Sequence, residues 1–251
     1  MSVSLLNPKS GVTVLQVNRP RVRNALNWEA MEAFAACIKQ VYTMPGLRVL
    51  IITGSEKAFI AGGDIKELSK YPAQSDGLRL SRLMGKALKR LEALPIITIA
   101  AVNGPARGGG TEIALACDLR VMANDADFGL VQITLGLTPG WGAGQRLLRL
   151  VGYSRALEWL ATGRILSAQE ALASGIANRL APPGKALEEA HDLAQMIASQ
   201  PQQATCAVKR LLRAGVLFPP ETAASIEEAE FPPLWASEEH VRAVERFLSR
   251  K

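Results

Sequence analysis

Strand-length apolar runs alternate with amphipathic helical segments through the first half of the chain. Val49–Thr53 and Ile96–Val102 are continuous apolar runs, typical of strands buried on both faces of a parallel sheet, and Asp118–Met122 is predicted as a third strand. Apolar residues from Leu80 to Leu94 recur at the i+3 and i+4 spacing of a helix. Because parallel strands are joined by right-handed crossovers through helices, this order predicts a layered α/β domain.

The flanking segments extend this pattern. Val12–Val17 is rich in β-branched residues and predicts an earlier strand, and Asn27 can cap the helix that follows it. After about residue 140 the sequence is mostly helical, with one short strand expected near Ile176–Leu180. We therefore expect residues 1–195 to form an α/β core and residues 196–251 to form a C-terminal helical region.

The composition argues against several classes of protein. Three separated cysteines and two histidines in late helical stretches predict neither a disulfide framework, nor a His-based triad, nor a metal site. The chain starts without the features of a signal peptide, and no apolar run approaches the roughly 18 residues that span a membrane, so we expect a cytoplasmic protein. The formal charge of +6 suits an anionic ligand, but the basic residues are dispersed, so nucleic-acid binding is not expected.

Two glycine-bearing segments follow the predicted buried strands. Ala58–Asp64 contains Gly62 and Gly63, and Gly104–Glu112 contains three consecutive glycines that open a predicted helix. Taken alone, the first segment would indicate only a tight strand-to-helix loop. Glycine lets a ligand approach the main chain closely, and the first N–H groups of a helix have no intrahelical partner. Because fixed donors stabilise a carbonyl oxygen that becomes anionic, we expect the two segments to form an oxyanion site.

Glu112 follows the glycines by one turn, and the residues that come after it in the sequence, Ile113–Cys117, are apolar. Burying a carboxylate is costly unless it is hydrogen-bonded, so its place beside the expected donors favours a functional role over a capping or surface one. Two competing motifs are incomplete. Gly110 stands where a phosphate-binding loop has its lysine, and Gly140–Gly144 lacks the final spacing and the preceding strand of a dinucleotide-binding fingerprint.

Several ordered motifs resemble those of the crotonase superfamily, also called the enoyl-CoA hydratase/isomerase family. The likeness covers nearly the whole chain, and the matching segments are Asn18–Asn27, Ala58–Lys66, Val102–Glu112, Cys117-Asp118, Phe128-Gly129, Leu135–Pro139 and Gly144–Arg146. This resemblance implies an α/β fold with a ββα spiral core and C-terminal helices, assembled as a homotrimer or a dimer of trimers. Residues 196–251 would then be a trimerisation region. It also implies an acyl-CoA substrate and no separate cofactor, since coenzyme A is part of the substrate.

The resemblance also implies roles for individual residues. By motif position, the N–H groups of Gly63 and Gly109 would bind the thioester oxygen and stabilise an enolate, with Glu112 as the acid/base. The positions expected to line the substrate are Arg23, Ala25, Leu26, Ala61, Asp64, Ile65, Lys66, Gly110, Pro139 and Trp141.

Gln132 departs from the hydratase pattern. Hydratases of this family use a second glutamate twenty residues after the one that Glu112 matches, and that position is Gln132 here. An amide can hydrogen-bond a water but cannot transfer a proton as a carboxylate does, so hydration is expected to be weak. A neutral amide would suit decarboxylation of a malonyl-type thioester, because it does not repel the substrate carboxylate. The Pro139–Gly142 stretch also looks like the corresponding region of decarboxylase-like members.

A hydratase/isomerase-type reaction is thus the first expectation, and decarboxylation is the alternative. A protein of another class, with the crotonase fold but without catalysis, would bind RNA or a partner. It would predict a dense basic stripe, whereas local clusters occur only at Arg19–Arg23 and Lys209–Arg213. A purely structural oligomer is disfavoured because both donor segments are intact. The acyl chain cannot be assigned from the sequence.

Overall fold

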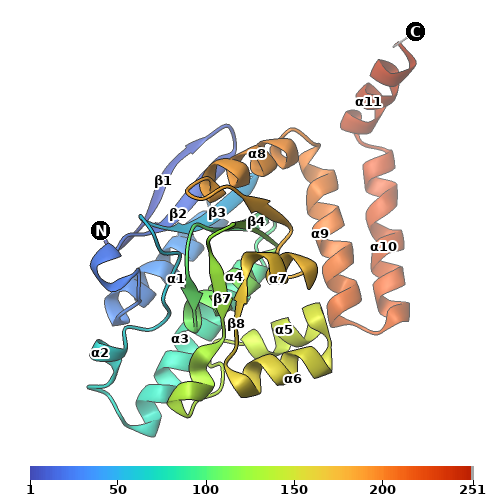
Figure 1. Ribbon diagram of the computed structural model, residues 1–251. Helices are drawn as coiled ribbons and strands as arrows, with labels where there is room; N and C mark the ends of the chain where they lie inside the picture. Colours follow the sequence, from blue (N-terminus) through green and yellow to red (C-terminus); the bar gives the residue numbers. More distant parts are fainter. Residues whose placement is uncertain (250–251) are drawn as a thin grey trace.

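A six-stranded sheet forms the centre of the molecule, which the computed structural model describes over residues 1–249 (Figure 1). Its strands are β1 (Val3–Lys9), β2 (Val12–Val17), β3 (Val49–Gly54), β4 (Ile97–Val102), β6 (Leu119–Ala123) and β9 (Arg179–Ala181). They lie in the order β1-β2-β3-β4-β6-β9, with β1 antiparallel to β2 and every other neighbour parallel. The predicted α/β class is confirmed.

A second sheet of three short strands carries residues close to the glycine segments. Its strands are β5 (Ala106–Arg107), β7 (Asp127–Gly129) and β8 (Ile165–Ser167), in the order β5-β7-β8. The N–H of Gly108 donates to the carbonyl of Gly129 at 2.8 Å, and Arg107 forms an ion pair with Asp127 at 2.5 Å. The second sheet therefore fixes the backbone directly before the three glycines.

Helices pack on both faces of the main sheet and continue beyond it. They are α1 (Trp28–Tyr42), α2 (Ile65–Leu68), α3 (Gln74–Glu92), α4 (Gly109–Ala116), α5 (Ala143–Val151), α6 (Tyr153–Thr162), α7 (Ala168–Ala173), α8 (Ala186–Ala198), α9 (Gln202–Leu217), α10 (Pro220–Trp235) and α11 (Glu238–Leu248), with 3-10 turns η1 (Pro20–Val22) and η2 (Val131–Leu135). Asn27 caps α1 as predicted, since its side chain accepts from the N–H of Ala30 at 3.0 Å.

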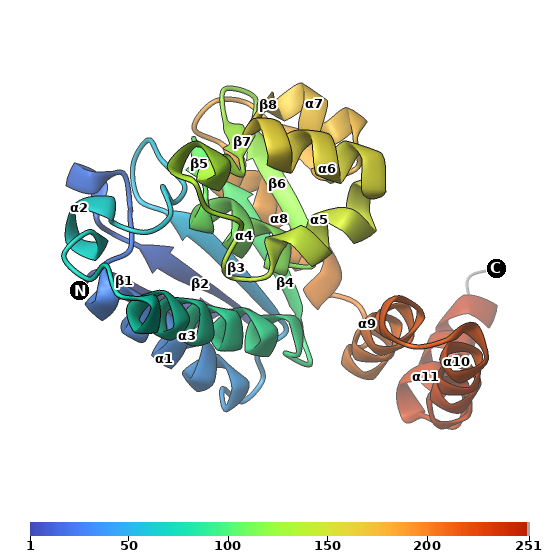
Figure 2. The same cartoon turned by 90° about the horizontal axis from the view of Figure 1, so that it is seen from below.

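The core lies on both sides of β3 and β4. Helices α1, α3 and α4 cover one face, and α1 and α3 lie side by side in Figure 2. Helix α8 covers the other face, where Ala190 and Ala194 pack with Val14 and Ile51. All six residues of β3 are buried, which explains why this strand reads as a continuous apolar run rather than as an alternating one.

Helix α4 is the most deeply placed helix, because all eight of its residues are buried. A Cβ atom on Gly110 would lie 1.7 Å from the carbonyl oxygen of Ile60. The helix therefore packs directly on the backbone that precedes Gly62, a distance that only glycine allows.

Helices α9, α10 and α11 extend away from the two sheets (Figures 1 and 2). Lys209 of α9 joins them to the core, because its buried ammonium donates to the Ile96 carbonyl and to the Asp118 carboxylate, each at 2.7 Å. Large apolar side chains are exposed on α10 and α11, namely Phe231, Trp235, Val241, Val244, Phe247 and Leu248. The expected boundary at residues 195/196 falls inside α8, and the division into two regions stays a prediction.

Four short or irregular strands differ from the sequence-based expectation. The sequence did not predict β1, because Asn7-Pro8 interrupts its apolar pattern, nor β5, β7 and β8, which are too short to show a periodicity. The strand expected near Ile176–Leu180 lies slightly later, at Arg179–Ala181. No helix within residues 1–249 is long and apolar enough to cross a membrane.

Candidate active site

The segment around Leu26 and the glycine turn after β3 lie side by side. Leu26 forms a parallel bridge with Gly63, in which its N–H donates to Gly62 at 2.7 Å and its carbonyl accepts from Asp64 at 2.8 Å. The N–H of Ala61 donates to the carbonyl of Arg23 at 3.1 Å. The structure thus brings together the two segments that are expected to line the substrate, Arg23–Leu26 and Ala61–Lys66.

The glycine turn also contacts the first residue of α4. Gly62 has a φ of +93°, and a Cβ on it would lie 2.9 Å from both the amide nitrogen of Gly109 and the carbonyl oxygen of Arg107. Across residues 1–249 no backbone acceptor takes the N–H of Gly63 or that of Gly109. Gly109 is the first residue of α4, where an N–H has no intrahelical partner and the helix dipole is positive. The two glycines therefore present free donors from adjoining segments.

A buried polar network supports the glycine turn from the other side. Arg19 forms an ion pair with Asp64 at 3.2 Å and also donates to the carbonyl of Ala25. Asn24, with a φ of +60°, is fully buried; its amide donates to Ser55 and Ala58, each at 2.9 Å, and its oxygen accepts from the Arg19 N–H at 2.8 Å. The sequence motif contained both residues, but motif position alone did not indicate this supporting role.

Glu112 lies in the first turn of α4 and is almost fully buried. One carboxylate oxygen accepts from the Gln132 amide at 2.9 Å and from the Gly140 N–H at 3.2 Å. The other accepts from the N–H groups of Trp141 at 2.8 Å and Ala143 at 3.0 Å. Since a carboxylate offers about four acceptor positions, these four contacts hold both oxygens in place, and uptake of a proton would displace one of them.

Two opposing effects act on the Glu112 carboxyl. Burial raises its pKa above the ordinary value, while the N–H groups of Ala143, Trp141 and Gly140 and the charge of Arg146 lower it. Burial is the larger effect, so the pKa is raised overall. The group is therefore a carboxylate that takes up a proton more readily than one in water.

Gln132 lies beside Glu112, as its match to the second glutamate position of the family implied. Its Nε2 is committed to Glu112 Oε1, whereas its Oε1 is buried and has no hydrogen-bond partner among the described residues. A buried acceptor without a partner is costly, and a bound ligand or water can satisfy it. The neutral residue at this position therefore offers an acceptor but no proton.

The loop that binds Glu112 is fixed by three residues for which the sequence analysis predicted no role. Ser81 of α3 donates to the carbonyl of Gly140 at 2.7 Å. Arg146 donates to the carbonyl of Trp141 at 2.8 Å and forms an ion pair with Glu92 at 2.7 Å. Arg146 belongs to a matched motif, which is the only sign of this role in the sequence; Ser81 and Glu92 look like ordinary polar residues of a helix.

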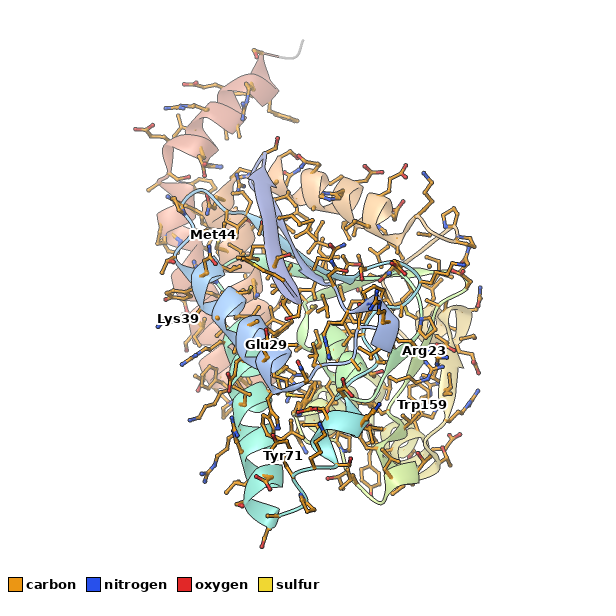
Figure 3. All side chains as sticks on the ribbon, turned by 90° about the vertical axis from the view of Figure 1, so that its left-hand side faces the viewer. Arg23, Glu29, Lys39, Met44, Tyr71 and Trp159 are labelled. Atoms are coloured by element: carbon orange, nitrogen blue, oxygen red, sulfur yellow. The ribbon has the colours of Figure 1, made fainter. Side chains whose placement is uncertain are left out.

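The other predicted substrate-lining residues differ in exposure. Arg23 and Lys66 are exposed and Ile65 is 60% exposed, so their side chains can reach a ligand; Figure 3 shows Arg23 at the surface. The Leu26 side chain is fully buried, so only its backbone borders the turn. Gly110 packs against Ile60 rather than facing open space. A contact of any of them with substrate stays a prediction.

Comparison with known proteins gives a consistent result. The sequence profile described as enoyl-CoA hydratase/isomerase matches residues 7–251. The chain is 34% identical over 248 residues to the short-chain-enoyl-CoA hydratase of Clostridium acetobutylicum, covering 98% of this chain and 95% of that one. It is 35% identical over 248 residues to the crotonyl-CoA hydratase of Syntrophomonas wolfei, with the same coverage.

Solved structures agree with this result. The enoyl-CoA hydratase of Bacillus anthracis superposes with a TM-score of 0.94 at 32% identity, covering 100% of this chain and 97% of that one. The chain therefore belongs to the enoyl-CoA hydratase/isomerase family, within the crotonase superfamily, and the predicted crotonase-like fold is confirmed. It is an enzyme of the hydratase/isomerase type.

Proposed function

We propose that this enzyme binds an acyl-CoA and stabilises the enolate of its thioester with the N–H groups of Gly63 and Gly109. Glu112 acts as the acid/base for the reacting carbon. One observation carries the proposal. Two N–H donors that have no backbone acceptor within residues 1–249 are brought together by the close approach of Gly62 to Gly109, and a buried carboxylate follows one turn later. Donors that are fixed before charge develops each contribute roughly 3 to 4 kcal/mol to a barrier of this kind.

A reaction of the enoyl-CoA hydratase/isomerase type is the first candidate, and the names of the relatives support it. Gln132 Oε1 could accept a hydrogen bond from a water or a substrate hydroxyl, because it is buried and without a partner in the described part of the chain. Every proton transfer would then fall to Glu112, since an amide cannot take part. A raised pKa, which eases the uptake of a proton, fits Glu112 for that role.

Decarboxylation of a malonyl-type thioester is the second candidate. It is favoured by the contact between Gln132 and Glu112, which places a neutral amide, rather than a second base, beside the carboxylate. Loss of CO2 needs the oxyanion donors but no base in its first step, because the electrons of the breaking C–C bond form the enolate. Only the later delivery of a proton to carbon would then require Glu112.

A panel of thioesters tests both candidates. We would incubate the enzyme with crotonyl-, 3-enoyl-, methylmalonyl- and ethylmalonyl-CoA and identify the products by mass spectrometry. Gain of water, a shifted double bond or loss of CO2 would assign the reaction. Calorimetry with the same thioesters measures binding separately, and failure of every acyl-CoA to bind would refute the proposed function.

We further propose a homotrimer or a dimer of trimers that works in the cytoplasm without a cofactor beyond the coenzyme A of its substrate. The exposed apolar side chains of α10 and α11, including Phe231, Trp235 and Phe247, support an assembly that buries them. Light scattering on the full chain, compared with a chain that ends at residue 218, tests this. A monomeric full-length chain would contradict it.

A further inference from the structure

The indole of Trp141 lies directly against the glycine that begins α4. A Cβ atom on Gly109 would lie 2.1, 2.3 and 2.8 Å from three carbons of the six-membered ring of this indole. Such distances are far below a van der Waals contact, so the ring edge occupies the space where a side chain at position 109 would be. Trp141 is 5% exposed, and its backbone N–H donates to the Glu112 carboxylate at 2.8 Å.

The backbone on either side of Trp141 is held by hydrogen bonds, which fix the point from which the indole projects. Glu112 accepts the N–H groups of Gly140, Trp141 and Ala143. The carbonyl of Trp141 accepts from Arg146, and that of Gly140 accepts from Ser81. Because its main chain is fixed and the ring packs within the hydrophobic core, the indole can leave this place only if neighbouring side chains move.

The position of the ring matters because of the geometry of a thioester. With its oxygen on the Gly109 N–H, the α-carbon of the acyl group lies about 2.4 Å from that oxygen, as the lengths of the two bonds at a carbonyl carbon require. Reacting carbons must also come within reach of Glu112. The start of the acyl chain is therefore confined between Gly109 and Glu112. Trp141 contacts both residues, Gly109 through its indole ring and Glu112 through its backbone N–H.

From this arrangement we propose that Trp141 determines specificity by limiting the acyl group to short chains. The inference rests on the proposed function, because it takes Gly109 as a donor to the thioester oxygen. A rigid aromatic ring beside the reacting carbons excludes added methylenes through overlap, which costs more than the binding that those methylenes would contribute. Replacing the indole with a small side chain would open this space.

Binding of saturated acyl-CoAs tests the inference without requiring any reaction. We would measure the Kd of butyryl-, octanoyl- and lauroyl-CoA by calorimetry for the wild type, Trp141→Ala and Trp141→Phe. The wild type is expected to bind butyryl-CoA at least tenfold more tightly than lauroyl-CoA, and Trp141→Ala to reduce that ratio by about tenfold. Trp141→Phe, which keeps an aromatic ring, is expected to give an intermediate ratio and covers the case in which the alanine variant does not fold.

Tyr42→Ala is the control, because Tyr42 is an aromatic residue that is 68% exposed at the end of α1. It should leave the ratio unchanged. Equal binding of butyryl- and lauroyl-CoA by the wild type, or an unchanged ratio in the folded Trp141 variants, would overturn this inference while leaving the proposed function intact. Failure of all three acyl-CoAs to bind the wild type would overturn both.

Discussion

The two ends of α4 each have a carboxylate, and the two carboxylates are stabilised in different ways. Glu112, in the first turn, accepts only neutral N–H groups, one from Gln132 and three from the backbone. Asp118, just after the helix, accepts from the ammonium of Lys209 at 2.7 Å and from the N–H and hydroxyl of Thr98 at 2.8 Å each. Both groups are hydrogen-bonded, but only Asp118 has a cation in direct contact.

The difference teaches how one buried helix can support both chemistry and architecture. Neutral donors hold a carboxylate in place without a counter-ion, and burial then raises the pKa of Glu112, which suits a group that exchanges protons. A buried ion pair instead fixes two elements relative to each other, because either partner left alone would be an uncompensated charge. The first end of α4 therefore carries the proposed site, and the second end attaches α9 to the core.

The largest effect is expected at the first end. Glu112→Gln should reduce turnover by about a thousandfold or more, because the amide cannot exchange the proton. The new NH2 group would also face N–H donors that now bind an oxygen, at a cost of roughly 2 to 3 kcal/mol in the free energy of unfolding. Steady-state kinetics, calorimetry with butyryl-CoA and chemical denaturation measure the three quantities.

Asp118→Asn is the matched variant at the second end. It should lower stability while leaving turnover per folded molecule nearly unchanged. Full activity in Glu112→Gln would remove Glu112 from the mechanism, and a comparable loss of turnover in both variants would contradict the division of roles along α4.

Gly109→Ala is expected to have the next largest effect. The added Cβ would collide with the indole of Trp141, displace the N–H from the thioester oxygen and reduce kcat by about a hundredfold to a thousandfold. Gly85→Ala in α3 is the control, since nothing lies within 4 Å of a Cβ there and it should be neutral or slightly stabilising. Adding Trp141→Ala to Gly109→Ala should restore part of the lost kcat; simple additivity would argue against the collision as the cause.

Lys209→Met tests the second end by itself. It leaves Asp118 without its cation and should lower the free energy of unfolding by about 3 kcal/mol. Loss of the contact should also make α9 to α11 more susceptible to limited proteolysis. Unfolding curves and protease digestion measure these effects, and an unchanged stability would show that Lys209 does not anchor the helices.

Arg146→Gln should produce the smallest change, which appears in the pH dependence. The charge of Arg146 lowers the pKa of Glu112, so its removal should raise that pKa further. Activity that needs the ionised carboxylate would then be lost at a higher pH as the solution is acidified, and the acidic limb of kcat against pH should move upward. Arg146→Lys keeps the charge and should leave the acidic limb of the kcat–pH profile closer to its original position. If the limb moved equally in both variants, the shift would be assigned to loop geometry rather than to charge.

The central strands could be predicted from sequence because their burial on both faces leaves continuous apolar runs. Val49–Thr53 matches β3 within one residue, and Asn27 caps α1 as its side-chain chemistry suggests. The proximity of the two glycine segments was also predicted. The structure explains it, because the segments follow β3 and β4, neighbouring parallel strands whose carboxyl ends meet at one edge of the sheet. Strands β5, β7 and β8 were missed because two or three residues cannot show a period.

Contacts that depend on loop conformation were beyond sequence reasoning. Nothing in the residue pattern indicates that Ser81 and Arg146 hold the carbonyls of Gly140 and Trp141. The pairing of Lys209 with Asp118 joins residues that are far apart in sequence, and a basic residue in a helix is usually solvated. Motif position indicated the identities of the candidate site residues, whereas their supporting contacts depend on the three-dimensional path of the loop.

The bridge between Leu26 and Gly63 also has a consequence for how the enzyme acquires activity during folding. The proposed oxyanion donors acquire their arrangement only when this bridge, the approach of Gly62 to Gly109 and the contact of Trp141 with Glu112 have all formed. Each closes a long loop, and contacts between distant parts of a chain form late because closure entropy must be overcome first. During refolding, the capacity to bind a thioester should therefore return only in the final kinetic phase, after helical signal has recovered.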